Sequence, residues 1–401
     1  MRLASPIDGD RGRSLSLGCG ESRDVAEDSP RVPLWWRNDS RIRYPSVHLP
    51  GPGSTAPGAR RPMAWFRSAV VLVARTATRG RARIFMFHRF GPPGTPNPRR
   101  LAADILDRQL SHLRRHYRIV PLRELVARLR AGRDLSPGTV ALTVDDAYSD
   151  FGEDAYPVFA HHQVPVTLYV VSDFASGRIW LWWDAIRYML TAAVHGERAG
   201  SVLGNALQLS FSGPDTREQA WRTLAGRATA LSPQERDRYL GDLQQLMGVV
   251  LPSTPPPEYA AMTWDHLRRL DPSLVEIGAH TRTHPILSHC DAEQLRAEVE
   301  ESRQVIEHEL GRPITTFCYP NGQPPDVNEA VRTAVRNSGY ESAVMACGSL
   351  VGAGSDPTAL SRLGASANWD AFVSEASGLP FLRDRMRSWR RRMRRHGSAG
   401  S

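Results

Sequence analysis

The chain has 401 residues, of which 41% are apolar and 23% charged, and its formal net charge is +9. This length and apolar content suffice for one large α/β domain or two ordinary ones, and they argue against disorder throughout. All 51 basic residues are arginine, which excludes lysine Schiff-base chemistry and any phosphate-binding loop built on Gly-Lys-Ser/Thr. Much of the excess positive charge lies in the two tails, and we expect no nucleic-acid partner.

The first 80 residues fall into two parts. Residues 1–62 are rich in Pro, Gly, Ser and Arg without periodicity, which predicts a disordered N-terminal extension. Residues 63–80 have the pattern of a short amphipathic helix that could lie on a core or on a membrane surface. No stretch reaches the roughly 18–20 apolar residues of a membrane span, and the start lacks a secretion signal. We therefore expect a cytoplasmic protein, which could also lie peripherally at the inner face of the cell membrane.

Cysteine usage agrees with a reducing compartment. The four cysteines, Cys19, Cys290, Cys318 and Cys347, are widely spaced, and no Cys-x-x-Cys pair indicates a metal or redox site. Free thiols are the simplest interpretation.

Between residues 81 and 380, short β-rich runs alternate with amphipathic helical patterns. The strand-like runs lie at 84–89, 139–144, 165–171, 274–280, 315–320 and 341–346. The helical patterns lie at 102–116, 121–131, 151–162, 291–310 and 325–338. Near-continuous apolar strands that alternate with helices indicate a parallel sheet buried on both faces, either open or closed into a barrel.

The alternation is interrupted between about 176 and 262, where helical patterns precede a Pro-rich linker at 252–259. We interpret this stretch as an inserted helical lid rather than as a separate domain. Residues 381–401 form a strongly basic tail, which is either a solvated charged end or a contact to anionic lipid or polymer.

Two adjacent carboxylates, Asp145 and Asp146, directly follow the apolar run TVALTV. They are expected at the carboxyl end of a buried parallel strand, where active sites of α/β folds gather. Adjacent carboxylates repel unless a cation or a proton offsets the repulsion, and neighbouring side chains diverge along a strand, so the two can take different roles. The alternative is a helix N-cap, because Asp favours the first turn of a helix.

A pair of histidines, His280 and His284, lies in the sequence HTRTH after another strand-like run. Imidazoles four residues apart can hold one divalent cation where the backbone turns helically, and a carboxylate from another strand completes the set. A structural role for this pair is the alternative. His112 and His116 have the same spacing but lie among arginines on a predicted helix, so we interpret them as surface residues.

A third predicted strand ends in FCYPNG, where Pro320 and Gly322 favour a tight turn. Such a turn exposes backbone N–H groups that can stabilise an oxyanion, although most Pro-x-Gly sequences are only turns. Three strand ends that carry carboxylates, imidazoles and this turn together predict a metal-dependent hydrolase site.

These motifs resemble those of the polysaccharide deacetylases of carbohydrate esterase family four, which share the chitooligosaccharide deacetylase homology domain. TVDDAY is similar to the family's Thr-Phe-Asp-Asp-Gly-Tyr motif, HTRTH to its His-Ser/Thr-x-x-His motif, and FCYPNG to the Tyr-Pro-x-Gly form of its third motif. FMFHRF and LSRLG resemble segments of the bacterial exopolysaccharide members. The resemblance covers about residues 80–370 and implies an α/β fold, a distorted, incomplete (β/α) barrel of about seven parallel strands with an inserted helical segment.

The resemblance also implies roles for individual residues. Asp146, His280 and His284 would bind a divalent metal, most often Zn²⁺, and Asp145 would be the general base. The turn after the third strand would hold the oxyanion, with the backbone N–H of Asn321 best placed, and the substrate-binding residues there would be Tyr319 and Pro320. The implied reaction is metal-dependent hydrolysis of an N-acetyl group from an amino sugar in a polysaccharide, an oligosaccharide or a lipid-linked glycan precursor.

Several positions depart from the family pattern. Ala147 replaces the usual Gly after the paired aspartates, a mild change unless that backbone needs a positive φ. Cys318 stands where better-known members carry an Arg that orients the base, and Arg362 could supply the missing cation. Asn321 stands where those members carry Tyr.

The source of the proton for the leaving amine is open, because no clear match to the family's late Leu-x-x-His motif is present. His88, at the end of the first predicted strand, is a candidate acid or substrate contact, or else a buried structural histidine. Trp180, Trp182 and Trp183 could stack on sugar rings or could anchor the inserted segment in an apolar core.

Three other functions remain open, one of which is nucleic-acid binding through the arginine-rich tail. Similar domains also hydrolyse non-sugar C–N bonds, such as those of cyclic amides. The chain could instead be a catalytically silent carbohydrate-binding protein, which the missing orienting Arg and the missing acid favour. The intact predicted metal ligands and base argue against that alternative.

Overall fold

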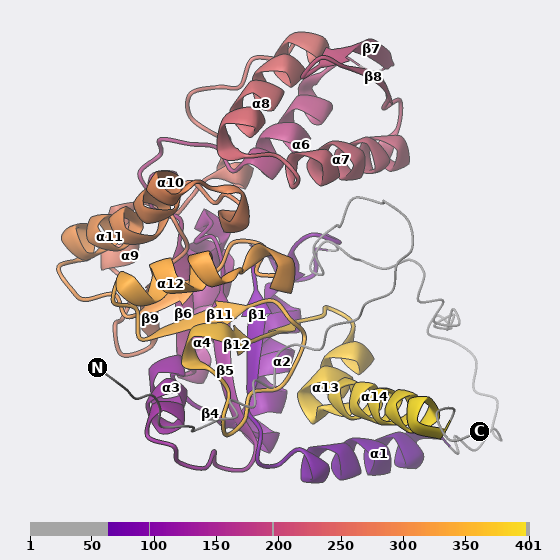
Figure 1. The fold of residues 1–401 in the computed structure, drawn as a ribbon, viewed down its shortest axis with the longest axis vertical. Helices are drawn as coiled ribbons and strands as arrows, with labels where there is room; N and C mark the ends of the chain where they lie inside the picture. Colours follow the sequence, from indigo (N-terminus) through magenta and orange to yellow (C-terminus); the bar gives the residue numbers. More distant parts are fainter. Residues whose placement is uncertain (1–62, 96, 195, 398–401) are drawn as a thin grey trace, which may run out of the picture.

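The computed structural model describes residues 63–95, 97–194 and 196–397. At its centre, a parallel sheet curves nearly into a closed barrel and helices pack around it (Figure 1). The predicted disordered extension at 1–62, which includes Cys19, lies outside the described residues.

The strands of the barrel are short and buried. In spatial order they are β12 (Leu360–Ser361), β11 (Ser342–Met345), β10 (Thr316–Cys318), β9 (Val275–Ala279), β6 (Val166–Val170), β5 (Thr139–Val144), β1 (Arg83–Phe87) and β13 (Leu363–Gly364), with β4 (Arg118–Ile119) beside β5. Every pair along this order is parallel. The predicted fold class, a distorted (β/α) barrel, is therefore confirmed.

A single short segment connects the two ends of the sheet. Only Arg362 separates β12 from β13, yet β12 pairs with β11 at one end and β13 pairs with β1 at the other. The two act as one interrupted strand, so the eight strands of the spatial order fill seven positions around the barrel. Arg362 itself is buried. Strands of two residues are too short to show a periodic pattern, and the sequence analysis did not predict them as strands.

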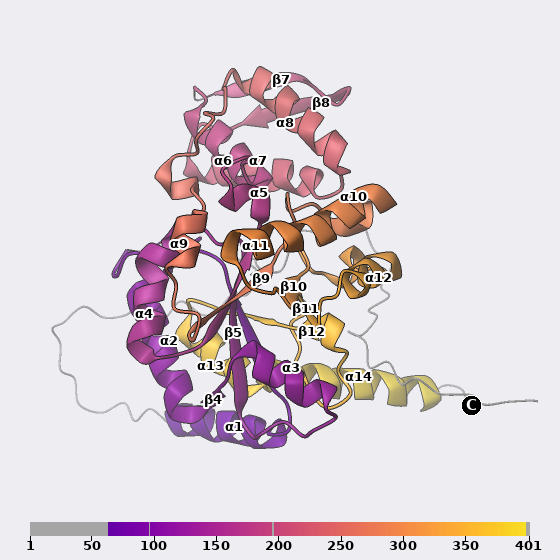
Figure 2. The ribbon, with the colours of Figure 1, turned by 90° about the vertical axis from the view of Figure 1, so that its left-hand side faces the viewer.

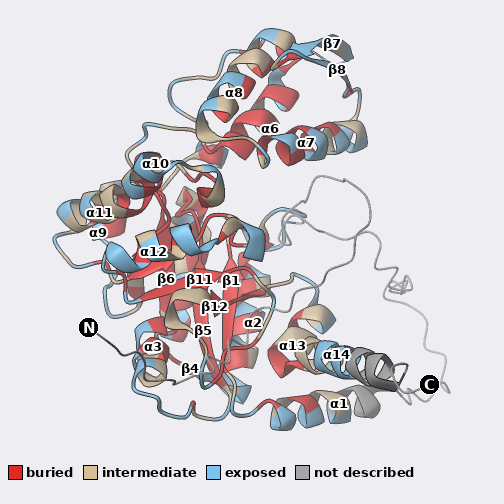
Figure 3. Ribbon diagram, viewed as in Figure 1, coloured by how far each residue is buried: buried red, intermediate tan, exposed pale blue. Residues whose placement is uncertain are grey.

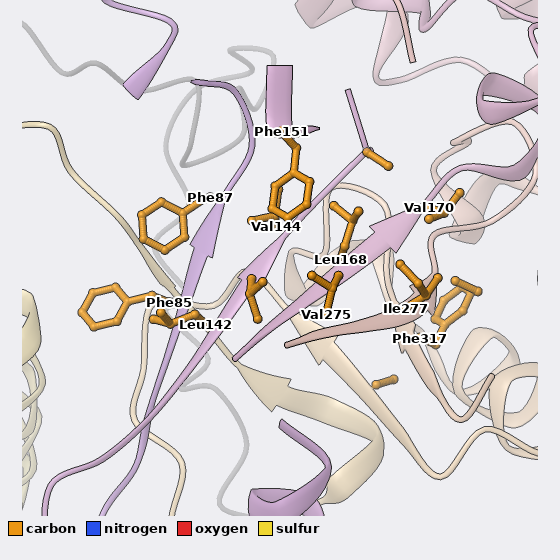
Figure 4. Packing of buried hydrophobic residues seen from close by; sticks show 14 of the residues in the cluster. Phe85, Phe87, Leu142, Val144, Phe151, Leu168, Val170, Val275, Ile277 and Phe317 are labelled. Atoms are coloured by element: carbon orange, nitrogen blue, oxygen red, sulfur yellow. The ribbon is translucent and has the colours of Figure 1, made fainter. Parts of the chain in front are cut away.

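Alternate residues of each strand face opposite sides of the sheet. The outer face packs under the helices, where Phe85, Leu142, Leu168 and Ile277 lie in one apolar cluster (Figure 4). A second cluster combines residues of five strands, Ile84, Ala141, Tyr169, Cys318 and Val344, with neighbours outside the sheet such as Leu122 and Leu125. The burial map shows both faces of the sheet covered (Figure 3).

Helices surround the barrel. They are α2 (Ala103–His116), α3 (Leu122–Arg130), α4 (Tyr156–His162), α9 (Trp264–Arg268), α10 (Ala292–Arg296), α11 (Ser302–Leu310) and α12 (Glu329–Asn337), with π-helical turns at Phe151–Ala155 and Ala297–Glu301. Amphipathic spacing orients them: in α2, Leu106, Leu110 and Leu113 recur on one face and are buried, while Arg114 and Arg115 are exposed.

The segment between β6 and β9 forms the insertion. It contains α5 (Ser172–Ala175), α6 (Trp182–Ala192), β7 (Glu197–Val202), β8 (Asn205–Ser210), α7 (Pro214–Ala228) and α8 (Pro233–Met247). Helices α6 to α8 and the two strands lie beyond one end of the barrel in both Figure 1 and Figure 2. They share an apolar cluster that includes Leu209, Trp221 and Leu224. The insertion therefore has a core of its own.

The predicted helical insertion also contains an antiparallel hairpin, formed by β7 and β8, that was not predicted from the sequence. Its two-residue turn, Leu203–Gly204, has a positive φ at both positions. Such turns are usually marked by Asn-Gly or Asp-Gly, and a leucine gives no such signal.

Three helices complete the chain: α1 (Met63–Ala77), α13 (Trp369–Ser377) and α14 (Leu379–Gly397). They lie at the end of the barrel opposite the insertion (Figures 1 and 2). None of the helices in the described ranges combines the length and the apolar content that a bilayer span needs.

Candidate active site

Residues from separate strand ends meet in one small cavity at the carboxyl end of the barrel. Asp145 and Asp146 follow β5, and His280 follows β9 directly. The cavity is lined by Met86, His88, Asp145, Asp146, His280, His284, Tyr319, Asn321, Ala346 and Arg362. Residues remote in the sequence thus converge as the three motifs predicted, because the carboxyl ends of parallel strands share one edge of the sheet.

Asp146, His280 and His284 form a group that could hold a metal ion. Asp146 Oδ1 lies 3.5 Å from Nε2 of His280 and 3.6 Å from Nε2 of His284, and this buried oxygen has no hydrogen-bond partner. The Nδ1–H of His280 donates to the backbone carbonyl of Cys318 over 2.8 Å, which leaves the Nε2 lone pair facing Asp146. A buried, unpartnered carboxylate oxygen beside two imidazole nitrogens fits a divalent cation such as zinc.

The electrostatics of the group also fit a cation. Burial, together with the neighbouring Asp145, raises the pKa of Asp146 well above its ordinary value. Burial and the nearby His280 lower the pKa of His284 well below its ordinary value, so the imidazole is neutral and able to act as a ligand. A divalent cation would favour the ionised form of Asp146, since it offsets both the burial and the repulsion from Asp145.

Asp145 is held by a buried arginine. Arg362 Nη1 lies 2.6 Å from Asp145 Oδ1, and Nη2 lies 2.8 Å from Oδ2, a two-point contact of planar groups. Burial alone would raise the pKa of Asp145, but Arg362 and His88 outweigh it and hold that pKa well below its ordinary value. Asp145 is therefore ionised at neutral pH, as a general base requires.

Cys318 leaves room for this arginine. Its Sγ lies 3.1 Å from Nη2 of Arg362, and burial raises the pKa of the thiol well above its ordinary value, so the side chain is small and neutral. The guanidinium that the family pattern places at position 318 thus comes here from the segment between β12 and β13.

The backbone around the cavity is strained at several residues other than glycine. Positive φ values occur at Asp146 (71°), Ala147 (57°), Thr281 (65°), His284 (58°) and Asn321 (58°). Such conformations cost of order 1–3 kcal/mol each and concentrate at functional sites. The replacement of Gly by Ala147 is therefore not a mild change, because this position does have a positive φ.

Glu298 holds the turn between the two histidines. Its carboxylate accepts the backbone N–H of Arg282 (2.8 Å), the backbone N–H of Thr283 (2.9 Å) and the Thr283 hydroxyl (2.6 Å). The Thr281 hydroxyl in turn accepts the backbone N–H of His284 over 3.0 Å. Glu298 thus orients His284 without touching it.

Glu298→Ala is expected to weaken metal binding by about 10–100-fold, the usual effect of removing a group that orients a ligand. Competition with a chromophoric chelator measures this affinity. Glu300→Ala is the matched control, because Glu300 lies in the same π-helical turn but pairs with Arg296 over 3.3 Å. Equal affinities for the two variants would show that Glu298 does not orient His284.

Only some of the residues predicted around the third motif line the cavity. Tyr319 and Asn321 line the cavity, whereas Pro320 is buried outside that lining. The Tyr319 hydroxyl donates to the carbonyl of Thr358 over 2.9 Å, so this hydroxyl already has a partner within the fold. The amide of Asn321 donates to Asp326 over 2.6 Å, which fixes the turn.

The tryptophans belong to the core of the insertion. Trp182 and Trp183 are each 5% exposed and pack in its apolar cluster. A buried ring cannot stack on a sugar that approaches from solvent, so the structure favours the core alternative over substrate binding. Trp180 is half-buried, and its indole donates to the carbonyl of Pro252 over 2.9 Å.

A polar network joins the insertion to the cavity, and it was not predicted from the sequence. Arg89 pairs with Asp150 over 2.6 Å and its guanidinium lies 3.7 Å from the centre of the Tyr148 ring. The Tyr148 hydroxyl donates to Asp184 of α6 and accepts the indole N–H of Trp183 over 3.0 Å. The Trp183 ring then meets His284 edge-on, with the ring centres 4.6 Å apart. Tyr148 and Asp150 follow the paired aspartates in sequence, which was the available signal.

His112 and His116 lie away from the cavity, on α2. His116 is exposed as predicted, but His112 is half-buried, with its ring centre 5.3 Å from that of Trp369. The interpretation as surface residues therefore applies fully only to His116.

Comparisons with known proteins agree with the motifs. The family model described as polysaccharide deacetylase matches residues 132–196 and 255–343. These stretches contain both aspartates and both histidines of the cavity, and they flank most of the insertion. A search of curated proteins found no match.

Three solved structures were matched at low identity. The Streptococcus pyogenes deacetylase PplD in complex with acetate is 15% identical with a TM-score of 0.48, over 75% of this chain and 99% of that chain. IcaB from Ammonifex degensii is 14% identical with a TM-score of 0.46, over 75% and 97%. The BpsB deacetylase domain from Bordetella bronchiseptica is 16% identical with a TM-score of 0.43, over 71% and 96%. Likeness at this level supports no conclusion about activity. The motifs of the sequence and the matching family model nevertheless agree, and residues 132–196 and 255–343 match a polysaccharide deacetylase domain.

Proposed function

We propose that the protein is a metal-dependent deacetylase that hydrolyses N-acetyl groups of amino sugars in a polysaccharide, an oligosaccharide or a lipid-linked glycan precursor. The observation that carries the proposal is the pairing of Asp145 with Arg362 beside the group formed by Asp146, His280 and His284. The family match supports a glycan as the substrate. A cytoplasmic location stays a prediction from composition.

Each residue of the cavity has a proposed task. Asp145, kept ionised by Arg362, accepts the proton of the attacking water. A divalent metal held by Asp146, His280 and His284, with Zn²⁺ as the proposed ion, would supply Lewis acidity. The turn at Asn321 offers its backbone N–H to the developing negative charge.

The proton taken up by Asp145 must reach the leaving amine. His88 Nε2 lies 3.5 Å from Asp145 Oδ2, inside the same cavity. Burial lowers the pKa of His88 to about 4, although Asp145 opposes the shift, so the imidazole is neutral and can accept and pass on a proton. We assign this relay to His88 in place of the missing late histidine.

The test is acetate release from N-acetylglucosamine oligomers. We expect acetate in the presence of zinc, loss of activity after chelation, and recovery when zinc is added back. His280→Ala should lose both bound metal and activity, whereas His112→Ala, taken from the pair with the same spacing, should keep both. A panel of cyclic amides accompanies the glycans. Turnover of those amides without turnover of any acetylated glycan would contradict the proposed substrate, and no turnover of either would favour a silent binding protein.

A further inference from the structure

An apolar groove lies between α1 and α14, at the end of the barrel opposite the insertion (Figures 1 and 2). It encloses about 710 Å³ and is lined by Val70, Val73, Ala74, Leu379, Met386 and Trp389, among others. Three of the lining side chains, Val73, Met386 and Trp389, and the neighbouring Leu72 are large and apolar, and each of the four is 54–66% exposed. We call the exposed side of these two helices the basal face. Soluble chains seldom leave clustered large apolar side chains in water without a partner.

The basal face is also cationic. The sequence of α14, residues 379–397, has eight arginines against one acidic residue, Asp384, and three of these arginines lie in the part whose side chains the structure describes. Arg383, Arg385 and Arg387 are exposed, and Arg385 lines the groove. Helix α1 has no acidic residue at all. The face therefore combines apolar side chains with a large excess of positive charge.

The two helices are fixed parts of the fold. The buried Arg83 of β1 donates to the carbonyls of Ala376 (2.8 Å) and Ser377 (3.1 Å), where α13 ends and α14 is about to begin. The hydroxyl of Thr78, just after α1, donates to the same Ser377 carbonyl over 3.2 Å. The groove is thus built between anchored helices and is not the product of a loose tail.

We propose that the basal face docks on an anionic lipid bilayer. Helices with apolar side chains on one side and arginines beside them bind in the interface of a membrane, where the apolar groups enter the acyl boundary and the arginines meet lipid phosphates. A nucleic acid would pair with the arginines but would leave Val73 and Met386 in water, so the charge alone does not explain the groove. No helix in the described ranges is suited to cross the bilayer, and the contact is therefore peripheral.

The geometry has a consequence for substrate access. The cavity lies at the carboxyl ends of the barrel strands. The insertion is on that side of the barrel, whereas α1 and α14 lie at the other end (Figure 2). A docked molecule therefore presents its active site away from the membrane. This consequence rests on the proposed function and favours a polymer or oligosaccharide near the membrane over a substrate buried in the bilayer.

Vesicle flotation of the full chain tests the docking without any assay of activity. The protein should bind vesicles that contain phosphatidylglycerol, and bind vesicles of phosphatidylcholine alone far less. Arg385→Gln with Arg387→Gln should weaken binding by about tenfold or more, since each basic residue near the surface contributes. Met386→Ser with Trp389→Ser should weaken it as well, because apolar area is lost.

The matched control is Arg222→Gln with Arg238→Gln, the same charge change at exposed positions of the insertion, which should bind as the unchanged protein does. Equal binding to both vesicle types, or to neither, would overturn the proposal. The proposal would also be overturned if the protein bound RNA as tightly as anionic vesicles and the Met386 and Trp389 changes left vesicle binding unaltered. That outcome would identify a site for polyanions in general.

Discussion

Asp145→Asn is expected to reduce acetate release from acetylated oligomers by about 10²–10⁴-fold, the range that a positioned general base contributes. The asparagine keeps the shape of the side chain but cannot accept the proton of the attacking water. The bound-metal content should stay unchanged, because Asp146 and the two histidines are untouched. Acetate release and metal content, measured on the same preparation, check this result.

The same change has a structural effect that must be separated from the chemical one. Arg362 is buried, and Asp145 is the carboxylate that pairs with it. Breaking a buried pair by removing one partner costs about 3–5 kcal/mol because it leaves an uncompensated buried charge, and neutralising both partners removes that charge. A double variant, Asp145→Asn with Arg362→Gln, should therefore regain much of the thermal stability but none of the activity. Activity that returns together with stability would show that Asp145 acts only through the fold.

Much of the fold could be predicted from local sequence patterns. The run 139–144 contains only apolar and β-branched residues and coincides with β5, because a strand buried on both faces excludes charged side chains. The helix predicted at 102–116 is observed at Ala103–His116 for the analogous reason of amphipathic spacing. Elements with weak local signals were missed. The hairpin of the insertion turns at Leu203, and it is held by Leu207 and Leu209 in a core that only the tertiary fold creates.

The residues of the candidate site also differ in whether a local sequence signal marks them. Asp145, Asp146, His280 and His284 could be predicted because each lies in a short motif at a strand end. Glu298 and Asp184 could not, since they act through hydrogen bonds to residues 15 or more positions away, and nothing in their own neighbourhood marks them. The tryptophans could not be assigned from the sequence, which left both a sugar platform and a core anchor open. The local sequence of an exposed aromatic cluster does not differ from that of a buried one. Only the burial seen in the structure distinguishes a surface that could stack on sugars from a core.

Arg362 is the position where this chain departs most informatively from the family pattern. Its guanidinium reaches Asp145 from the segment that joins β12 to β13, and Cys318 occupies the place of the expected arginine. We therefore expect Arg362→Ala to lower kcat/KM by about 10²-fold at neutral pH, the loss that a misplaced reacting group can cause. Without Arg362, burial dominates the pKa of Asp145, which should rise, so the acid limb of the pH–rate profile should move to higher pH.

The stability of this variant should also depend on pH. In the unchanged protein the pKa of Asp145 is depressed, so its pairing stabilises the fold above the unfolded-state pKa of about 3.9 and is lost as pH falls through the lower folded-state value. The difference in Tm between the unchanged protein and Arg362→Ala should therefore be largest near neutral pH and shrink towards acid. Arg83→Ala is the control, because Arg83 is equally buried but donates to backbone carbonyls at the far end of the barrel. It should lose stability without shifting the pH–rate profile.

A relocated arginine provides the decisive variant. Cys318→Arg in the Arg362→Ala background places the guanidinium where the family pattern has it, next to the position that Arg362 Nη2 now occupies, 3.1 Å from the Cys318 sulfur. If the task of Arg362 is to hold Asp145 ionised and oriented, the double variant should recover at least part of the lost activity, and its acid limb should return towards the original pH. Recovery of Tm without recovery of the profile would mean that Arg362 serves only to close the barrel between β12 and β13. A single Arg362→Ala variant with an unchanged profile would exclude the positioning role outright.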